Sequence, residues 1–198
     1  MRPVLVSFVV LMSMLAGCAS PRASFYRLSA DPSLTAISTA TATRATTRPV
    51  IVGPVTVPDL VDRPQIVTRN TDNEVALNEY ARWGEPLKSS IADAIAADLA
   101  VLLASGKVAP ASRAIADPDA WRVRVDIQQF ESVPGDAVMI DAQWTVRRFG
   151  DESALTGRSM VREPVNGDGW DALVAAHSRA LARVSREIAG AIAGSAVR

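Results

Sequence analysis

Cys18 is the residue of this chain that is best placed for covalent chemistry, because it is the only cysteine among 198 residues. It directly follows Leu15-Ala16-Gly17 at the end of an apolar stretch, residues 4–15, which Arg2 precedes. Such a layout is typical of a secretory signal peptide, and the stretch is shorter than the ~20 apolar residues of a membrane-spanning helix. The pattern resembles the bacterial signal for cleavage before a cysteine and acylation of that cysteine, which would also consume its thiol. The alternative for Cys18 is a small core residue.

Acylation would decide where the rest of the chain works. Several fatty chains, such as palmitate, anchor a protein stably, since each buried CH₂ contributes ~0.8 kcal/mol and a single chain binds only marginally. Ala19 stands where an Asp generally favours retention in the inner membrane, so we expect an outer-membrane anchor and a domain on the periplasmic face. The expected organisation is a signal peptide at 1–17, a lipidated tether at 18–24 and one domain at 25–198.

Charge and composition argue against two classes of interaction. The chain holds 21 basic and 21 acidic residues, which gives a formal net charge of zero, and it has no polybasic run. Proteins that bind nucleic acid, or that bind membranes electrostatically, need a concentrated positive field. The sequence therefore predicts neither a nucleic-acid partner nor membrane binding by electrostatics alone.

The residues that could support catalysis or hold a metal are few. His177 is the only histidine and lies on the apolar stripe of a predicted helix, so it is either a general base or ligand, or a core residue that shares a hydrogen bond. We predict the core role, since no second histidine or free thiol is available for a metal site. Asp117-Pro118-Asp119 and residues 166–169 are interpreted as turns, because neither completes a calcium loop. With no nucleophile elbow and no phosphate loop, the sequence predicts neither an enzyme nor a bound cofactor.

The elements that must position these residues follow from the apolar periodicity. Strands are expected at 25–28, 49–57, 65–69, 74–77, 121–128, 138–147 and 155–163. One helix is expected to start at Pro86 and to end at a left-handed Gly106, and a second to span about 169–194. Pro54 lacks a backbone donor, which favours an edge strand or two short strands at 49–57. Residues 29–48 lack apolar periodicity and are interpreted as a solvated loop or flexible linker. The order predicts a mixed α+β or α/β sandwich in which helices cover a sheet.

Trp83 differs from the other tryptophans because it stands in a polar stretch, residues 80–85, between a strand and the first predicted helix. Its ring either packs over the start of that helix or is an exposed aromatic anchor beside Arg82, a combination common at protein interfaces. The remaining tryptophans fall in phase with apolar neighbours and are expected in the core.

Two segments resemble the signature of a known family. Residues 61–67 read VDRPQIV and residues 82–87 read RWGEPL, which are similar to the LDRPQIV and RWAEPL elements of the PqiC/YmbA family of outer-membrane lipoproteins. The departures are Val61 for Leu and Gly84 for Ala. The aromatic strand expected at 25–28 is also typical of this family.

The resemblance implies a non-enzymatic role in transport. Members of this family are auxiliary components of ABC-type transport that work with MCE-domain lipid transporters, and their three-layer fold resembles the amino-terminal domain of TolB. The expected partners are an MCE-domain periplasmic protein and an inner-membrane transporter component, and self-association would suit docking on a symmetric assembly. The candidate partner-binding residues are Asp62, Arg63, Arg82 and Trp83. The chain is thus expected to be an adaptor that supports membrane integrity, or alternatively a carrier that holds a lipid in an apolar groove.

Overall fold

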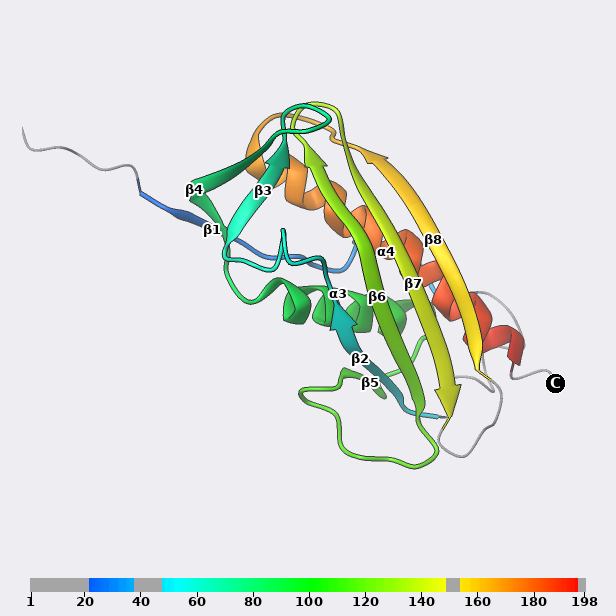
Figure 1. Cartoon of the computed structure of the whole chain (residues 1–198). Coiled ribbons are helices and arrows are strands. Elements are labelled where there is room, and N and C mark those ends of the chain that lie inside the picture. Colours follow the sequence, from blue (N-terminus) through cyan, green and yellow to red (C-terminus); the bar gives the residue numbers. More distant parts are fainter. Residues whose placement is uncertain (1–21, 38–47, 149–153, 196–198) are drawn as a thin grey trace, which may run out of the picture.

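The computed structural model of the protein describes residues 22–37, 48–148 and 154–195. Within these ranges the chain forms eight strands and two helices (Figure 1), and the mixed α+β class is confirmed. The strands divide into two mixed sheets rather than one. The predicted signal peptide, Cys18, the tether up to residue 21 and residues 38–47 of the predicted linker lie outside the described residues.

The larger sheet has five strands in the order β5-β2-β6-β7-β8. Their bounds are Val50–Thr56 for β2, Val108–Pro110 for β5, Trp121–Val133 for β6, Ala137–Arg148 for β7 and Leu155–Pro164 for β8. The last three form an antiparallel meander, as the alternation of apolar and polar residues predicts. That alternation buries one face of β6, β7 and β8 and leaves the other face to solvent.

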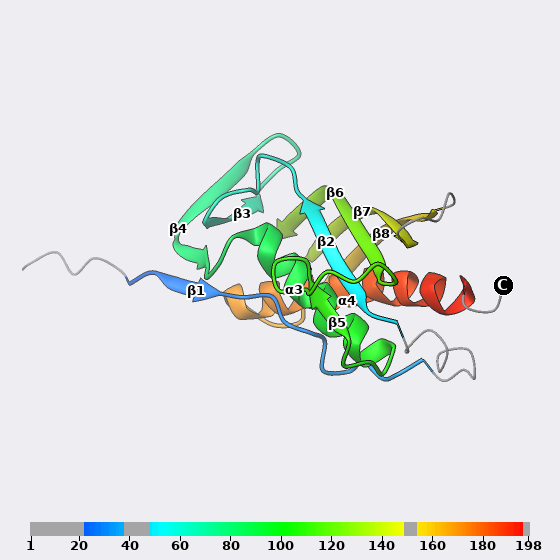
Figure 2. The ribbon, with the colours of Figure 1, turned by 90° about the horizontal axis from the view of Figure 1, so that it is seen from below.

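The strand β2 departs from the prediction for residues 49–57, because it is neither an edge strand nor two separate strands. It lies between β5 and β6 and is parallel to both (Figure 2). Its register against β6 shifts between Val52 and Val55, and β5 pairs with it only as far as Val52. Pro54 therefore falls in an irregular stretch beyond the end of β5, where no ladder hydrogen bond needs its missing N–H.

The smaller sheet has three strands in the order β1-β4-β3. Their bounds are Ser24–Tyr26 for β1, Gln65–Arg69 for β3 and Val75–Trp83 for β4. The strand β4 continues six residues past the predicted end at 77. Its second half was missed because it contains a bulge: Ile66 pairs with Asn78, whereas Gln65 pairs with Arg82. Asn78 Oδ1 accepts the N–H groups of Tyr80 and Ala81 inside this bulge, which interrupts the alternation that sequence reasoning relies on.

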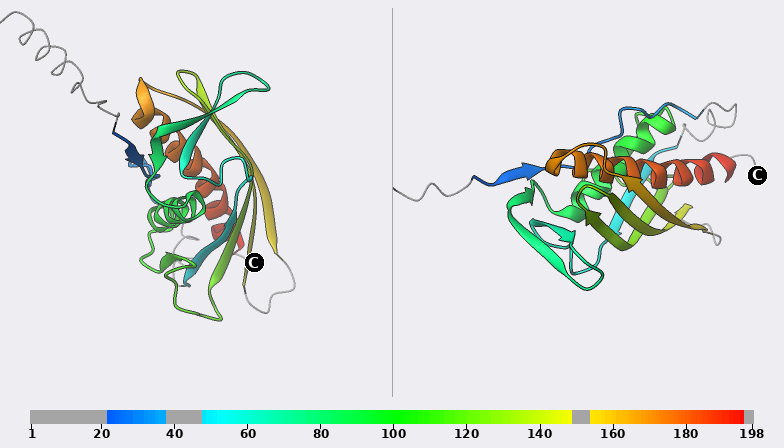
Figure 3. Two further views of the ribbon diagram at one scale, coloured as in Figure 1. Left: turned by 60° about the vertical axis from the view of Figure 1, so that its left-hand side comes forward. Right: turned by 90° about the horizontal axis from the view of Figure 1, so that it is seen from above.

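Both helices, α3 (Leu87–Leu102) and α4 (Gly169–Ser195), lie on one face of the five-stranded sheet (Figure 3). The hydrophobic core fills the space between the two helices and this sheet. Its largest fully buried side chains include Ile91, Ile95, Leu99, Ile140, Leu173, Leu181, Ile188 and Ile192. Among the residues that the structure describes, neither helix is long and apolar enough to cross a membrane.

The end of α3 corrects a further expectation, because Gly106 has no positive φ and Ala104 takes the left-handed conformation with φ of 47°. The Ala104 N–H donates to Val101 O at 3.1 Å, and the Ser105 N–H donates to Ala100 O at 3.0 Å. These two bonds satisfy carbonyls that a helix end otherwise leaves unpaired. The position at which the chain turns left-handed after α3 is therefore set by these backbone hydrogen bonds and not by the nearest glycine.

Candidate functional site

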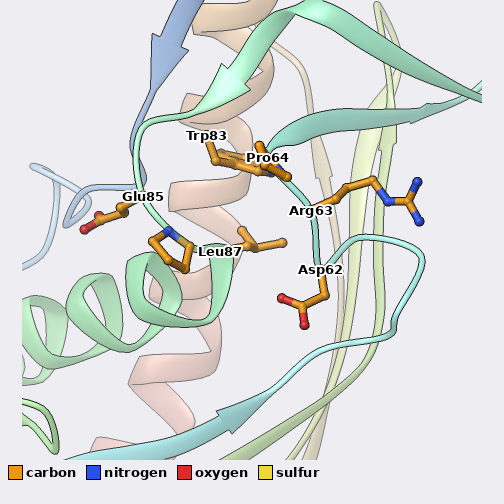
Figure 4. Close-up of a pocket in the computed structure, with 7 residues that line it drawn as sticks. Asp62, Arg63, Pro64, Trp83, Glu85 and Leu87 are labelled. Carbon is orange, nitrogen blue, oxygen red and sulfur yellow. The ribbon is translucent and has the colours of Figure 1, made fainter.

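The two family-like segments, which are separate in the sequence, meet around one pocket of about 380 Å³ (Figure 4). Its lining residues are Asp62, Arg63 and Pro64 from the loop after β2, and Trp83, Glu85, Pro86 and Leu87 from the junction of β4 with α3. The loop is folded by the N–H groups of Val61 and Asp62, which both donate to Pro58 O. Every lining residue thus belongs to one of the two segments.

Two interactions hold the walls of the pocket together. The Trp83 N–H donates to Pro64 O at 2.7 Å, which joins the end of β4 to the loop. The Lys88 ammonium lies 2.6 Å from Asp62 Oδ2, which joins the first turn of α3 to the same loop. Sequence reasoning missed Lys88, although it directly follows the second segment.

Trp83 and Leu87 form the apolar floor, with exposed fractions of 5% and 2%. The Trp83 ring meets the rings of Phe130 and His177 edge-on, at centroid distances of 6.3 and 6.4 Å. The alternative of an exposed aromatic anchor is therefore wrong, because the ring packs inward on the core and offers only one part of its surface to the pocket. Whether this surface binds a partner stays a prediction.

The rim of the pocket is charged. Asp62 is exposed, and Arg63 and Glu85 are half-buried; Figure 4 shows that the Arg63 guanidinium and the Glu85 carboxylate point away from each other across the opening. Arg63 Nε is buried without a hydrogen-bond partner among the described residues. An apolar floor inside a charged rim suits a short peptide segment or a single apolar group, and the volume lies at the lower end of the ~300–1,000 Å³ of small-molecule pockets.

The fourth candidate residue, Arg82, does not line the pocket. It pairs in register with Phe25 and Gln65, and because side chains alternate along a strand it lies on the face of β4 opposite to Trp83. Its guanidinium lies 3.5 Å from the Glu79 carboxylate. The structure thus brings Asp62, Arg63 and Trp83 together and places Arg82 elsewhere.

The first described strand borders this site. Tyr26 of β1 stands opposite Trp83 in the parallel ladder, and the Gly84 N–H donates to Tyr26 O at 2.8 Å. The Leu28 N–H then reaches Ser90 Oγ of α3 at 3.2 Å. The segment that follows the predicted anchor is therefore bonded to the strand and the helix that form one wall of the pocket.

The core role that we predict for His177 is confirmed. The side chain is fully buried, its ring stacks on Phe130 with a centroid distance of 4.1 Å, and Nε2 lies 2.7 Å from Ser132 Oγ. Burial lowers the pKa of His177 from 6.5 to about 3, so the ring is neutral.

The acidic turns have structural roles as well. The Asp119 N–H donates to Asp117 Oδ1 at 2.8 Å, which is the side-chain-to-backbone bond of an Asx turn. In the part of the chain that the structure describes, no group of three or more His, Cys, Asp or Glu side chains could hold a metal ion.

The chain is similar to a known protein family and to solved structures. Residues 26–189 match the family model described as ABC-type transport auxiliary lipoprotein component. A crystal structure of an uncharacterized protein is similar with a TM-score of 0.68 at 21% identity, over 85% of this chain and 97% of that one. A crystal structure of a Xanthomonas campestris protein is similar with a TM-score of 0.60 at 21% identity, over 89% and 97% of the two chains. These structures share the fold. No curated protein matches the sequence.

Proposed function

Since the chain belongs to the family of ABC-type transport auxiliary lipoprotein components, we propose that it is the outer-membrane-anchored adaptor of a system that moves lipids between the two membranes. Membership makes it a lipoprotein with partners in an ABC-type transporter, and the family is one of transport components rather than of enzymes. In the proposed role it faces the periplasm, receives an MCE-domain protein that extends from the inner membrane, and so supports membrane integrity.

The match over residues 26–189 is the observation that carries this proposal, and the position of Cys18 adds the anchor. β1 begins at Ser24, so only six residue steps separate it from Cys18. At ~3.3–3.6 Å per extended residue the tether reaches about 20 Å. An acylated Cys18 would hold the domain close to its membrane, and a partner from the other membrane would have to span the remaining distance.

We place partner binding at the pocket between the two family-like segments. Its apolar floor can accept a short apolar side chain, and the charged side chains at its rim, Asp62, Arg63 and Glu85, can bind polar groups of a partner. Interfaces commonly combine an apolar centre with a polar rim of this kind.

The size of the pocket favours the adaptor over the alternative of a lipid carrier. Its 380 Å³ is at the small end of drug-sized pockets, whereas a phospholipid with two acyl chains is larger than most drugs. Native mass spectrometry of the purified Cys18→Ala protein separates the two roles, since a copurifying phospholipid would favour the carrier.

Site-specific photo-crosslinking in cells tests the adaptor role directly. A photoreactive residue in place of Glu85, at the rim, is expected to capture an MCE-domain protein, and the same residue in place of Ile115, which is 89% exposed in a distant loop, is expected not to. If no MCE-domain protein is recovered from either rim position, 63 or 85, in cells that carry the partner genes, the proposal is wrong.

A further inference from the structure

The described part of the chain has two exposed aromatic side chains, and both lie beside β1. Phe25 is 66% exposed and Tyr80 is 50% exposed. The other described aromatic residues are buried or half-buried; they are Tyr26, Trp83, Trp121, Phe130, Trp144 and Trp170. An exposed aromatic pair in a domain that otherwise buries its rings calls for a specific environment.

The pair belongs to neighbouring strands at one end of the molecule. Phe25 lies on β1, and Tyr80 directly precedes Ala81, which pairs with Ser24 of β1. β1 is one of the two edge strands of the small sheet. Figures 1 and 2 place it at the end of the molecule opposite to the carboxyl end of α4. The chain enters the described structure at this end, four residues after Cys18.

The charges around the pair are mainly positive. Arg22 and Arg27 flank β1 and are both exposed, and Arg82 lies opposite Phe25 in the ladder. Two carboxylates lie nearby. Glu79 lies 3.5 Å from the Arg82 guanidinium, which offsets part of its charge, and Glu85 follows Gly84, whose N–H donates to Tyr26 O of β1.

We propose that this edge rests on the phospholipid bilayer that holds the anchor, with Phe25 and Tyr80 in the headgroup region and Arg22 and Arg27 against lipid phosphates. Tyrosine favours the membrane–water interface because one end of its ring is apolar and the other is wet. An exposed phenylalanine beside it can bury its apolar ring at the boundary of headgroups and acyl chains, and arginines there bind the anionic lipid surface. The tether, at about 20 Å, keeps the edge within reach of the bilayer. This inference rests on the proposed acylation of Cys18.

Contact with the membrane would leave the pocket free. Phe25 and Arg82 occupy one face of the small sheet, and Tyr26 and Trp83 occupy the other, because neighbouring residues in a strand point to opposite faces. Neither Phe25 nor Tyr80 lines the pocket. The small sheet can therefore bind lipid on its outer face and a partner on its inner side.

Depth-dependent fluorescence quenching tests the orientation on the full-length, acylated protein in vesicles of phosphatidylethanolamine and phosphatidylglycerol. Acylation blocks Cys18, so a single introduced thiol can be labelled with a nitrobenzoxadiazole dye. In the Tyr80→Cys protein we expect a blue-shifted emission and quenching by nitroxide-labelled lipid. In the Met160→Cys protein, whose label replaces a 75% exposed residue of β8, we expect neither.

A second set of variants separates the aromatic contact from mere closeness to the anchor. The dye is placed at Ser24→Cys, and a Gly-Ser spacer is inserted after Ala19. Quenching should persist in this protein and be lost when Phe25→Ser and Tyr80→Ser are added. If the spacer alone abolishes quenching, or if the label at 80 is quenched no more than the label at 160, the inference is overturned.

The result also distinguishes this inference from the proposed function. Protein that stays with the vesicles through an alkaline wash but shows no quenching at position 80 retains its anchor and contradicts only the orientation. Protein that the wash removes lacks the acyl anchor, and both proposals then fail.

Discussion

Lys88 Nζ lies 2.6 Å from Asp62 Oδ2, so an ion pair links the first turn of α3 to the loop after β2. This pair joins residues from the two sides of the pocket, and it sits where both segments with family resemblance come together. It offers a way to alter the geometry of the pocket without touching its apolar floor.

Asp62→Asn should reduce capture of the partner at position 85 with little loss of stability. Both side chains of the pair are more than a third exposed, so its loss should lower the free energy of unfolding by at most ~1 kcal/mol. Urea unfolding and the yield of crosslinked partner measure the two effects. Asp93→Asn, which breaks the Arg113–Asp93 pair at 3.0 Å, is the matched control and should leave capture unchanged. Equal capture by the Asp62→Asn and Asp93→Asn proteins would show that the Lys88–Asp62 ion pair does not contribute to partner binding.

Cys18→Ala should leave the domain folded and abolish transport. The substitution removes the predicted acylation site, and stable anchoring requires acyl chains. With residues 1–17 exchanged for a signal peptide whose cleavage needs no cysteine, cell fractionation should find the variant in soluble periplasm, and sensitivity to detergent should report the loss of membrane integrity. Normal transport by this soluble form would contradict the anchoring argument.

Asp98 predicts that stability falls as pH rises from about 4 to about 7. Burial raises the pKa of Asp98 from 3.8 to about 7, so the folded state binds a proton that the unfolded state has already lost in this range. The hydrogen bonds agree with a protonated Asp98. Ser185 Oγ lies 3.0 Å from both Asp98 Oδ2 and Leu181 O, and its one proton can be donated to only one of them. If the Ser185 hydroxyl donates to Leu181 O, the second bond forms when a protonated Asp98 donates to Ser185 Oγ.

Asp98→Asn should remove this pH dependence, because the amide donates to Ser185 at every pH and its oxygen still accepts from the Asp31 N–H, which lies 3.2 Å from Asp98 Oδ1. Thermal unfolding from pH 4 to 8 measures the difference between the variant and the native chain, with a slope of up to ~1.4 kcal/mol per pH unit. Parallel curves would show that Asp98 is ionised in the folded protein.

His177 has the opposite effect on stability. Its pKa is lowered to about 3, so the unfolded chain binds a proton between about pH 6.5 and pH 3 that the folded chain does not, and stability falls as pH falls through this window. His177→Leu should flatten this acid limb at the cost of leaving Ser132 Oγ unpaired. A folded His177→Leu protein should still support transport; selective loss of transport would instead point to a chemical role.

Gly157→Ala should destabilise the protein by about 1–3 kcal/mol, the usual cost of overpacking. Gly157 pairs with Trp144 across β7 and β8, and a Cβ at this position would clash with Trp144 Cζ2. Gly190→Ala is the control, because a Cβ there meets nothing within 4 Å and should raise helix stability by roughly 0.5–1 kcal/mol. Denaturant unfolding of both proteins measures the contrast, and an unchanged Gly157→Ala midpoint would show that the ring can move away.

Local patterns in the sequence were sufficient for most elements. The alternation at 121–128 and at 138–147, with Pro134-Gly135-Asp136 between them, predicts the β6–β7 hairpin that the structure contains. The apolar stripe around His177 predicts both α4 and the burial of that ring. These features depend on residues a few positions apart, so periodicity is enough to reveal them.

Relations between distant residues were decided only by the tertiary structure. No local pattern tells that β1 pairs with β4 and not with the larger sheet, that the bulge at 79–81 extends β4 to Trp83, or that Asp98 is buried between helices. The four candidate residues show the same limit: three meet at one pocket, whereas Arg82 faces the other way. The sequence determines which residues can do chemistry and on which elements they stand, but long-range strand pairing and packing decide which of them meet, because backbone hydrogen bonds and buried area are satisfied across the whole chain.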